Sequence, residues 1–508
     1  MYKISTTILL LLVAPYWLKS QIFPKEGSSL NYRLIGFEFP SIPEGGTCKL
    51  EIAAGVINSE DSFKRKILVS QDCKTNKIIA EVPAFGSQYT WRIISPDNNK
   101  QAANIFHHFS TAIIQNVDTS LRRVRIIKKA EAYKNAYFFL DGTRTLYDMS
   151  GSPVWFLPNF DNLPNENFDV RDLKLTPQGT VTFIAGEDAY ELNYNAEILW
   201  KGPNDGKVSG GSSEYYHHKF TRLANGHYMV LANEFDFWNR LMPSSGDSSF
   251  VICNSKTIPS DTSKGHYFSV PFGTIIEYDE KGNVVWAWRS MDYFKGSDIY
   301  YHKGRNGKPD LGTHENAFYF DEQAKTIYVS FRNIARIVKI KYPEGNVLAA
   351  YGETYEPALP EKGNGLFCHQ HSCGVSEKGY LYLFNNNLCN DGMLPTILMM
   401  QQPANGKGSL KKIWEYQCTI DGIDDAERAP KYAFIAGGNI TELPDHSLFA
   451  SMCANPYGKV FIVNQDKNIL WSALPETKNT ATGKWEATIF YEANIIANQS
   501  QLEHFIFH

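Results

Sequence analysis

The sequence predicts an all-β fold, a six-bladed β-propeller preceded by a small N-terminal β-sandwich domain. Two observations predict it. Short strand-like apolar runs alternate with turns along a chain that has 14% aromatic residues, 37 glycines and 24 prolines, as suits β-rich proteins with many tight turns. From about residue 134 these runs recur as similar units, which is the pattern of a repeat architecture. With 508 residues, 43% of them hydrophobic, the chain is long enough for both parts.

Residues 1–20 have the pattern of a signal peptide. A cationic start at Lys3 is followed by an apolar run over 8–14, and Ser20 offers a small residue at a plausible cleavage point. An uncleaved membrane anchor is the alternative, but the run is short for a span and Pro15 interrupts it. We therefore expect an exported protein, periplasmic or secreted, that starts near Gln21 and is not held by the membrane after cleavage.

Residues 21–118 are expected to form the β-sandwich domain. Short runs such as 32–37, 66–70 and 89–93 are separated by turn clusters, at a spacing that resembles a small sandwich. This domain could also mediate a homodimer. The chain has eight cysteines, an even number that an exported protein could pair. A bond between Cys48 and Cys73 is the first to expect, and the sequence leaves open whether Cys368 pairs with Cys373.

Residues 119–508 are expected to form the propeller, beginning with a strand over 121–129. In each unit, a tight turn joins two apolar strands and a later strand ends in tryptophan; the unit around 326–348 has no such tryptophan. The tryptophans that close the other units are Trp155, Trp200, Trp286, Trp414 and Trp471. Counting these units gives about six four-stranded blades, each of which covers its neighbour's sheet face.

The interval from Leu231 to Thr274 is long for one blade and rich in Ser, Pro and Gly. We expect it to be a loop that lies over one face of the propeller, with a disordered loop as the alternative.

Composition excludes some functions. The formal net charge is −4, from 50 Lys and Arg against 54 Asp and Glu. No basic excess suggests a nucleic-acid partner, and no motif for a cofactor is present. No paired CxxC pattern marks a zinc site.

Four polar blocks lie at strand starts or ends in different units, and they carry the chemistry. They are 216–220, 313–316, 330–332 and 369–372. The innermost strand of a propeller blade starts near the axis, so residues at one phase of successive blades converge on one mouth of the channel. The residues that we expect to converge are His217, His218, His314, Asn316, Arg332 and His371.

This set of side chains favours an anion over a metal. Three histidines can bind zinc, but a fixed guanidinium at Arg332 would repel a second cation, and Glu315 is the only acidic residue of matching phase. A compact anion such as sulfate or phosphate fits better, because arginine offers a planar fork to its oxygens. An imidazole can serve there as nucleophile, acid or oxyanion donor. We expect no bound metal.

The same blocks resemble the bacterial arylsulfate sulfotransferases, exported enzymes that work without the nucleotide sulfate donor. The segments that carry the resemblance are 216–226, 314–316, 330–332, 370–372 and 384–386, in this order. His-x-Asn followed by Ser-x-Arg is the strongest part. The resemblance covers the signal peptide, the N-terminal domain and the whole propeller.

The resemblance implies a ping-pong reaction between an aryl sulfate donor and a phenolic acceptor, with no cofactor. His371 would attack the sulfur and carry it as a sulfohistidine. His314 and Arg332 would hold the sulfuryl oxygens with His218, or His217, beside them. Asn316 would donate a hydrogen bond to a substrate oxygen or orient an imidazole. Sulfuryl transfer does need fixed cationic donors aimed at these oxygens.

One position departs from the family pattern. Lys219 stands where a His-His-Asp form has its acidic residue, which leaves open whether His217 or His218 faces the channel. Two other functions also stay open at this point. One is a non-catalytic propeller that binds a sulfated or acidic ligand such as a glycan, and the other is an aryl sulfate hydrolase.

Overall fold

The structure, a computed structural model, describes most of the chain outside its first 21 residues. The described ranges are 22–40, 48–94, 105–115, 117–159, 169–240, 266–294, 302–303, 309–310, 312–352, 366–387, 394–404, 409–418, 437–453 and 458–507. The signal peptide expected over 1–20 lies outside them. The chain divides into two compact units, Met1–Ile113 and Ile114–His508, and the all-β class predicted from the sequence is confirmed. No helix in these ranges is long and apolar enough to cross a membrane.

The first unit contains two sheets and one short helix. A five-stranded sheet has the order β1 (Ser28–Leu30), β7 (His107–Thr111), β6 (Gln88–Ile94), β3 (Cys48–Ala54) and β4 (Ile67–Cys73). A second sheet pairs β2 (Leu34–Glu38) with β5 (Lys77–Glu81), and α1 spans Glu60–Lys64. Phe37 packs its ring 5.0 Å from that of Trp91, which brings the two sheets together. Cys48 and Cys73 face each other in the β3–β4 register and form the expected disulfide.

The second unit contains six antiparallel sheets of at least four strands. In order from the first strand outward, the sheets are β35 (Ala493–Ile496), β9 (Tyr137–Leu140), β10 (Thr145–Asp148) and β11 (Pro153–Phe156); β12 (Val170–Leu175), β13 (Val181–Ala185), β14 (Asp188–Leu192) and β15 (Ile198–Lys201); β16 (Phe220–Arg222), β17 (Tyr228–Arg240), β18 (His266–Tyr278) and β19 (Val284–Arg289); β22 (Glu315–Asp321), β23 (Thr326–Phe331), β24 (Arg336–Lys341) and β25 (Val347–Tyr351); β26 (His371–Val375), β27 (Leu381–Asn385), β28 (Thr396–Gln401) and β29 (Lys411–Gln417); and β30 (Asn439–Glu442), β31 (Leu448–Cys453), β32 (Gly458–Val463), β33 (Ile469–Lys478) and β34 (Trp485–Ala487).

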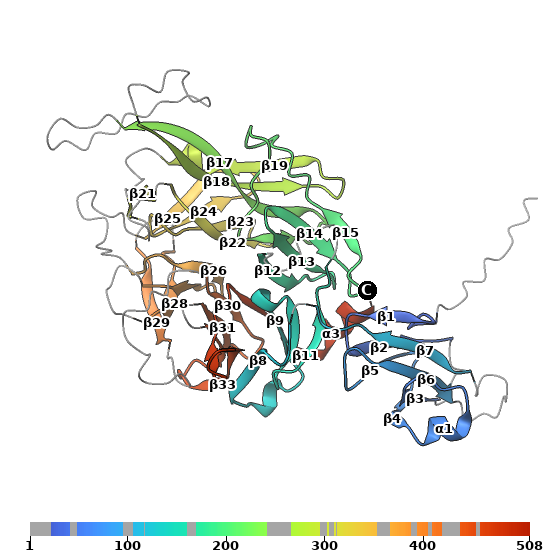
Figure 1. The fold of residues 1–508 in the computed structure, drawn as a ribbon. Coiled ribbons are helices and arrows are strands. Elements are labelled where there is room, and N and C mark those ends of the chain that lie inside the picture. The colour runs from blue at the N-terminus through green and yellow to red at the C-terminus, as the bar shows by residue number, and fades with distance from the viewer. Residues whose placement is uncertain are drawn as a thin grey trace, which may run out of the picture. The chain divides into compact units, whose positions relative to one another are not determined.

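Smaller elements complete this unit. They are β8 (Arg122–Lys128), which pairs with β33 and lies in the strand expected over 121–129, the pair β20 (His302–Lys303) and β21 (Pro309–Asp310), the 3-10 turns η1 (Glu131–Tyr133) and η2 (Asp141–Thr143), and the helices α2 (Ser290–Tyr293) and α3 (Gln499–Phe507). Figure 1 shows β12, β22, β26 and β30 toward the middle of the unit and β15, β19, β29 and β33 at its periphery.

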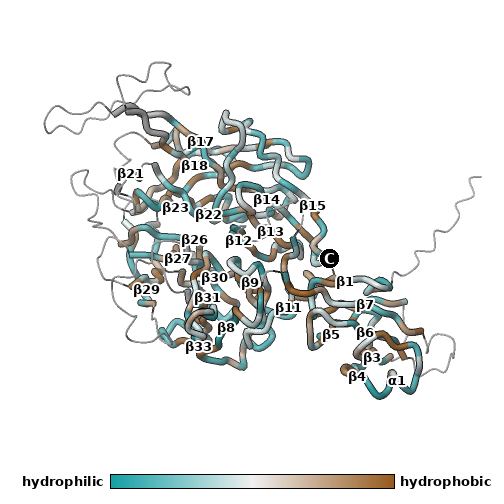
Figure 2. The backbone as a smooth tube through the Cα atoms, in the orientation of Figure 1, coloured by the Kyte–Doolittle hydropathy of each residue, from teal (hydrophilic) through white to brown (hydrophobic). Residues whose placement is uncertain are grey.

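The repeated turn seen in the sequence joins the first two strands of each sheet in the same way. Gly226 donates its backbone N–H to the carbonyl of Leu223 at 3.0 Å and has a φ of 89°. Gly379 repeats this bond to Ser376 at 2.8 Å with a φ of 81°. Such left-handed backbone favours glycine because it has no Cβ. The turns leave apolar strands between polar corners, an alternation that Figure 2 displays along the chain.

The tryptophans that end the units connect neighbouring sheets. Each donates its indole N–H to a carbonyl in the turn between the third and fourth strands of the next sheet. The bonds run from Trp155 to Tyr194 (2.8 Å), Trp286 to Pro343 (2.7 Å), Trp414 to Gln465 (2.7 Å) and Trp471 to Met149 (3.1 Å). The last bond joins the final sheet to the first. The repeated tryptophan is therefore an inter-sheet contact as well as a strand marker.

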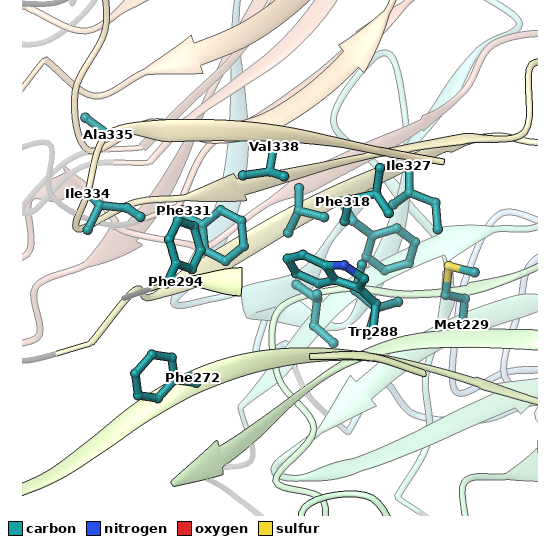
Figure 3. Close-up of a cluster of buried hydrophobic side chains, with 14 of the residues drawn as sticks. Met229, Phe272, Trp288, Phe294, Phe318, Ile327, Phe331, Ile334, Ala335 and Val338 are labelled. Atoms are coloured by element: carbon teal, nitrogen blue, oxygen red, sulfur yellow. The ribbon is translucent and has the colours of Figure 1, made fainter. Parts of the chain in front are cut away.

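Apolar packing between sheets forms the core. Figure 3 shows the cluster between the β16–β19 and β22–β25 sheets, where Met229, Phe272 and Trp288 meet Phe318 and Phe331. Burying aromatic side chains of this size contributes roughly 2–3 kcal/mol each before the entropy cost of ordering them. Because both faces of such sheets are covered, the strands in between, such as β23, are buried along their whole length.

The loop expected over Leu231–Thr274 is partly wrong. β17 and β18 are each 13 residues long and pair without a break from Tyr228 with Tyr278 to Arg240 with His266. The ends of the predicted loop are therefore strands of an extended hairpin, since β-branched and aromatic residues on both sides continue the ladder. Residues 241–265, the remainder of the predicted loop, lie outside the described residues.

Candidate active site

Three histidines and one tyrosine from four different sheets lie together at the starts of first strands. His371 is the first residue of β26, His314 immediately precedes β22, and His218 and Tyr491 each lie two residues before β16 and β35. The ring centroids of His218 and His314 are 5.5 Å apart. Tyr491 is 5.7 Å from His218 and 6.2 Å from His371. First strands that are neighbours, such as β22 with β26 and β35 with β12, bring these residues to one place.

Two guanidinium groups flank this cluster. Arg332 follows β23, and its backbone N–H donates to the carbonyl of His314 at 2.8 Å. Its positive charge lowers the pKa of both His314 and His371, after burial as the larger cause. Arg171 lies over the ring of Tyr491 at 4.8 Å and pairs with Asp169 at 2.6 Å. The cluster therefore combines neutral imidazoles with fixed positive charge, which is the electrostatic character of an anion site.

The orientation of His371 is set by Asn386. Nδ1 of His371 lies 2.7 Å from Oδ1 of Asn386. Nδ2 of Asn386 donates to the carbonyl of Gly437 at 3.1 Å, so its Oδ1 is the atom left to accept. The proton of a neutral His371 therefore sits on Nδ1, and Nε2 keeps its lone pair. Burial and then Arg332 lower the pKa of His371 to about 3, which keeps this ring neutral at pH 7.

His217 and His218 contact each other through their Nδ1 atoms, 2.7 Å apart. His218 contacts His314 and Tyr491, whereas Nε2 of His217 lies 3.4 Å from Oε1 of Glu315. The structure thus places His218 inside the cluster and His217 behind it. Burial, followed by the positive charges of His217 and His314, holds the pKa of His218 well below 6.5.

Asn316 connects two first strands. Its Nδ2 donates to the carbonyl of Gln370 at 2.7 Å, directly before His371. Gln370 in turn donates to Ser330 Oγ at 3.1 Å and to the Phe331 carbonyl at 3.0 Å. Asn316 therefore fixes the backbone that carries His371, which is the orienting alternative among the roles considered for it.

Lys219 takes part in a buried ion cluster next to the site. Its Nζ donates to Asp172 Oδ1 at 3.0 Å and to Glu492 Oε2 at 2.6 Å. Lys174 also pairs with Asp172, at 2.5 Å. Burial, opposed by Lys219, raises the pKa of Glu492 to about 7. The lysine that departs from the family pattern is thus neutralised by carboxylates from two other first strands, and it ties three sheets together beside Tyr491.

Backbone strain gathers at the same strand starts. His218 and His314 have φ values of 59° and 51°, and Asp172 and Ser372 have 56° and 51°. A non-glycine residue in this left-handed region costs of order 1 kcal/mol or more and persists only where the surroundings hold it, often at functional sites. In β12, β22 and β26 the ladder register also shifts at this point, which turns the bulged side chains toward the strand ends.

Two buried polar atoms at the cluster lack hydrogen-bond partners within the described residues. They are Oη of Tyr491 and Oδ1 of Asn316. The hydroxyl of Tyr491 is buried although its ring is partly exposed, and burial raises its pKa well above 10. It is a neutral donor without an acceptor, as expected where a polar ligand would bind.

Sequence reasoning did not assign roles to three residues at this site. Asn386 lies in a quoted motif, but its bond to His371 joins residues 15 apart. Tyr491 and Arg171 were not singled out because only histidine and arginine within the polar blocks were considered. The signal that could have found both is their place, since each lies at the start of a first strand, as the histidines do.

The thiols around the Gln370-His371 pair do not bond each other. Cys373 is a free, buried thiol, whereas Cys368 takes part in a disulfide. Burial raises the pKa of Cys373 to about 12, so it remains a protonated thiol. Within the described ranges, no group of three or more His, Cys, Asp or Glu side chains is arranged to hold a metal ion.

Comparison with known proteins gives one family and several distant folds. The chain is similar to a Bacteroides caccae protein of unknown function, with 11% identity, a TM-score of 0.36 and coverage of 69% of this chain and 93% of that one. A Bacteroides thetaiotaomicron quinonprotein alcohol dehydrogenase-like protein gives 10%, 0.34, 94% and 99%. The β-propeller domain of Myceliophteria thermophila Cps50 gives 8%, 0.31, 64% and 94%. No curated protein matches the sequence.

The family match covers the segment that carries most of the cluster. Residues 249–405 match the model of the arylsulfotransferase (ASST) family. His314, Arg332, His371 and Asn386 lie within this range, and His218 lies before it. The recognition of this family from the polar blocks is confirmed: over residues 249–405, the chain is a member of the arylsulfotransferase family.

Proposed function

We propose that this protein transfers a sulfuryl group from an aryl sulfate to a phenol through a covalent sulfohistidine at His371. The observation that carries the proposal is the pairing of His371 Nδ1 with Asn386 Oδ1 at 2.7 Å. It leaves Nε2 as a neutral lone pair inside a positively charged cluster. A neutral imidazole in that state is a competent nucleophile.

In the first half-reaction, Nε2 of His371 forms a bond to sulfur while the bond from sulfur to the aryl oxygen breaks. The electron pair of that bond leaves with the aryl oxygen as a phenolate. In the second half-reaction, the oxygen of an acceptor phenol bonds the sulfur, and the electron pair of the N–S bond returns to Nε2. His371 is thereby regenerated, and each half-reaction is a displacement at sulfur.

The charge on the sulfuryl oxygens would be stabilised by the residues around His371. Arg332 contributes a fixed positive charge strong enough to lower the pKa of both His314 and His371. The hydroxyl of Tyr491 is a buried donor. Donors that are fixed before the reaction and aimed at developing charge lower the barrier without reorganisation at the moment of transfer. Asn316 would act by holding the backbone before His371.

We further propose that the six sheets of Ile114–His508 are the blades of a propeller whose axis passes near the cluster. The tryptophan bonds between successive sheets and the bond from Trp471 to Met149 support a closed order. The pairing of C-terminal β35 with β9 supports it too, because it leaves no free edge at the first sheet. The two packed sheets of Met1–Ile113 would be the N-terminal sandwich.

Export to the periplasm or the exterior is part of the proposal. The signal-like pattern of residues 1–20 supports it, and so does the disulfide between Cys48 and Cys73, because disulfides persist in oxidising compartments. N-terminal sequencing of the exported protein should begin within a few residues of Gln21.

The proposed transfer is tested with a chromogenic aryl sulfate, with and without added phenol. Transfer requires the acceptor for sustained turnover, hydrolysis does not, and a ligand-binding propeller releases no product. With donor alone, mass spectrometry should find a sulfuryl group on the peptide that contains His371. His371→Asn should abolish both the adduct and the release of phenol. Full activity in this variant would contradict the proposal.

A further inference from the structure

Glu315 is a buried carboxylate placed behind the candidate site. It is 2% exposed and begins β22. Its Oε2 accepts a hydrogen bond from Thr313 Oγ1 at 2.9 Å, and its Oε1 lies 3.4 Å from Nε2 of His217. Space for it is made by Gly273, where a Cβ atom would lie 1.8 Å from Cδ of Glu315. A carboxylate removed from water in this way needs donors for its oxygens.

The contact between Glu315 and His217 is in ion-pair range, but its angle is outside hydrogen-bond geometry, because Nε2 of His217 is otherwise without a partner within the described residues. Such contacts in a site without substrate are often long and tighten when substrate binds. With Glu315 as acceptor, a neutral His217 carries its proton on Nε2, and its Nδ1 has a lone pair.

The second contact extends this arrangement to His218. The Nδ1 atoms of His217 and His218 are 2.7 Å apart, so one must donate and the other must accept. Because Nδ1 of His217 accepts, Nδ1 of His218 donates, and the lone pair of a neutral His218 is on Nε2. The left-handed backbone at His218, with a φ of 59°, and the bond from Lys219 N to the His217 carbonyl at 2.7 Å hold the two adjacent rings in this relation.

We propose that Glu315 and His217 are positioning residues that hold His218 in its Nδ1–H tautomer, so that Nε2 of His218 is the base that takes the proton of the acceptor phenol. This inference rests on the proposed sulfuryl transfer and deepens it. When the phenol oxygen bonds sulfur and the N–S bond returns its electron pair to His371, the phenol proton moves to Nε2 of His218. The charge of the imidazolium is then stabilised through His217 by Glu315. In the donor half-reaction, the same proton returns to the leaving phenolate.

The experiment measures the second half-reaction alone. The enzyme is first loaded with sulfuryl groups from an aryl sulfate, and the excess donor is removed. Two acceptor phenols are then added separately, one that is ionised at the assay pH and one that is not. The ratio of the two transfer rates is taken on one preparation of each protein, so the fraction of folded protein cancels. A phenolate needs no base, whereas a neutral phenol does.

Glu315→Gln and His217→Phe should each lower the rate with the neutral phenol by at least about tenfold relative to the rate with the phenolate, since a positioned base contributes roughly a hundredfold or more. Phe keeps a ring at position 217 without nitrogen atoms. The matched control is Glu277→Gln, because Glu277 is also buried and pairs with a histidine, His227 at 2.7 Å, outside this cluster. Its ratio should equal that of the wild type.

Each outcome decides between the two proposals. A wild-type protein that releases no phenol from aryl sulfates would overturn the proposed function and this relay with it. A wild-type protein that transfers, with rate ratios unchanged in Glu315→Gln and His217→Phe, would overturn the relay alone. Equal losses with both phenols in these variants would also overturn it, because they would show a general defect of the site.

Discussion

Oδ1 of Asn386 accepts the Nδ1 proton of His371 at 2.7 Å, and Nδ2 of Asn386 is itself bonded to the carbonyl of Gly437. The second bond matters as much as the first, because it determines which end of the amide faces the imidazole. An amide held at both ends fixes the tautomer of His371 without adding charge. This differs from a carboxylate partner, which would favour the protonated ring and remove the lone pair needed for attack.

Replacing Asn386 should therefore impair catalysis more than folding. In Asn386→Leu, Nδ1 loses its acceptor and the ring is no longer held in one tautomer, so turnover should fall on the order of a hundredfold or more. Steady-state rates with an aryl sulfate and a phenol measure this. The control is Asn385→Leu, which loses bonds to the Cys368 backbone and to Thr396 but touches no imidazole. It should melt at a lower temperature yet keep most of its turnover per folded molecule.

Arg332 should stabilise the transferring group more than it stabilises the fold. Loss of one donor of this kind lowers turnover on the order of a hundred- to a thousandfold, and Arg332→Lys should not restore it, because a point charge cannot make a two-pronged contact. Turnover and melting temperature are measured on the same preparations of Arg332→Ala and Arg332→Lys. A large loss of stability with near-normal turnover of the folded fraction would show a structural ion pair instead.

Lys219 should be a determinant of stability. Lys219→Met leaves the buried carboxylates of Asp172 and Glu492 without their shared cation, which should lower the free energy of unfolding by about 3–5 kcal/mol. Denaturant unfolding at pH 7 measures it. Adding Glu492→Gln to Lys219→Met should recover part of the loss, since one unpaired charge is then removed. If the single variant is as stable as the wild type, the cluster is not a stabilising one.

Acid should destabilise the protein through its buried histidines. His371 has a folded pKa of about 3 against a usual 6.5, so between these values the unfolded chain binds a proton that the folded chain does not. Stability from this group is therefore present above pH 6.5 and is lost as pH falls, by up to about 1.4 kcal/mol per pH unit. The raised pKa of Glu492 acts in the opposite direction, so the comparison is between variants.

Unfolding of the wild type and of His371→Asn by urea, measured from pH 7.5 to pH 4.5, isolates this contribution. The stability of the variant should fall less steeply with acidification, because asparagine does not titrate. Parallel curves would mean that the ring of His371 is protonated in the folded protein. Sulfate should protect the wild type more at low pH, since anion binding favours charged imidazoles.

The sequence by itself determined the features that depend on neighbouring residues. Turns such as the one at Gly226 and the strands on either side follow from local backbone preference, which predicts the all-β class. The histidines at strand starts were recognisable as residue types in a recurring phase. The same local reasoning failed for Leu231–Thr274, where polar and turn-forming residues in the middle of the interval hid the long hairpin that pairs its ends.

Only the tertiary structure decided which side chains meet. Lys219 and Glu492 are 273 residues apart, and Tyr491 reaches His218 only because the C-terminal strand β35 joins the sheet of β9. The choice between His217 and His218 also required the packed structure, since both have the same sequence context and differ only in which ring contacts His314. The physical reason is that a hydrogen bond or ion pair depends on atoms within about 3 Å, and sheet packing, not sequence order, sets those distances.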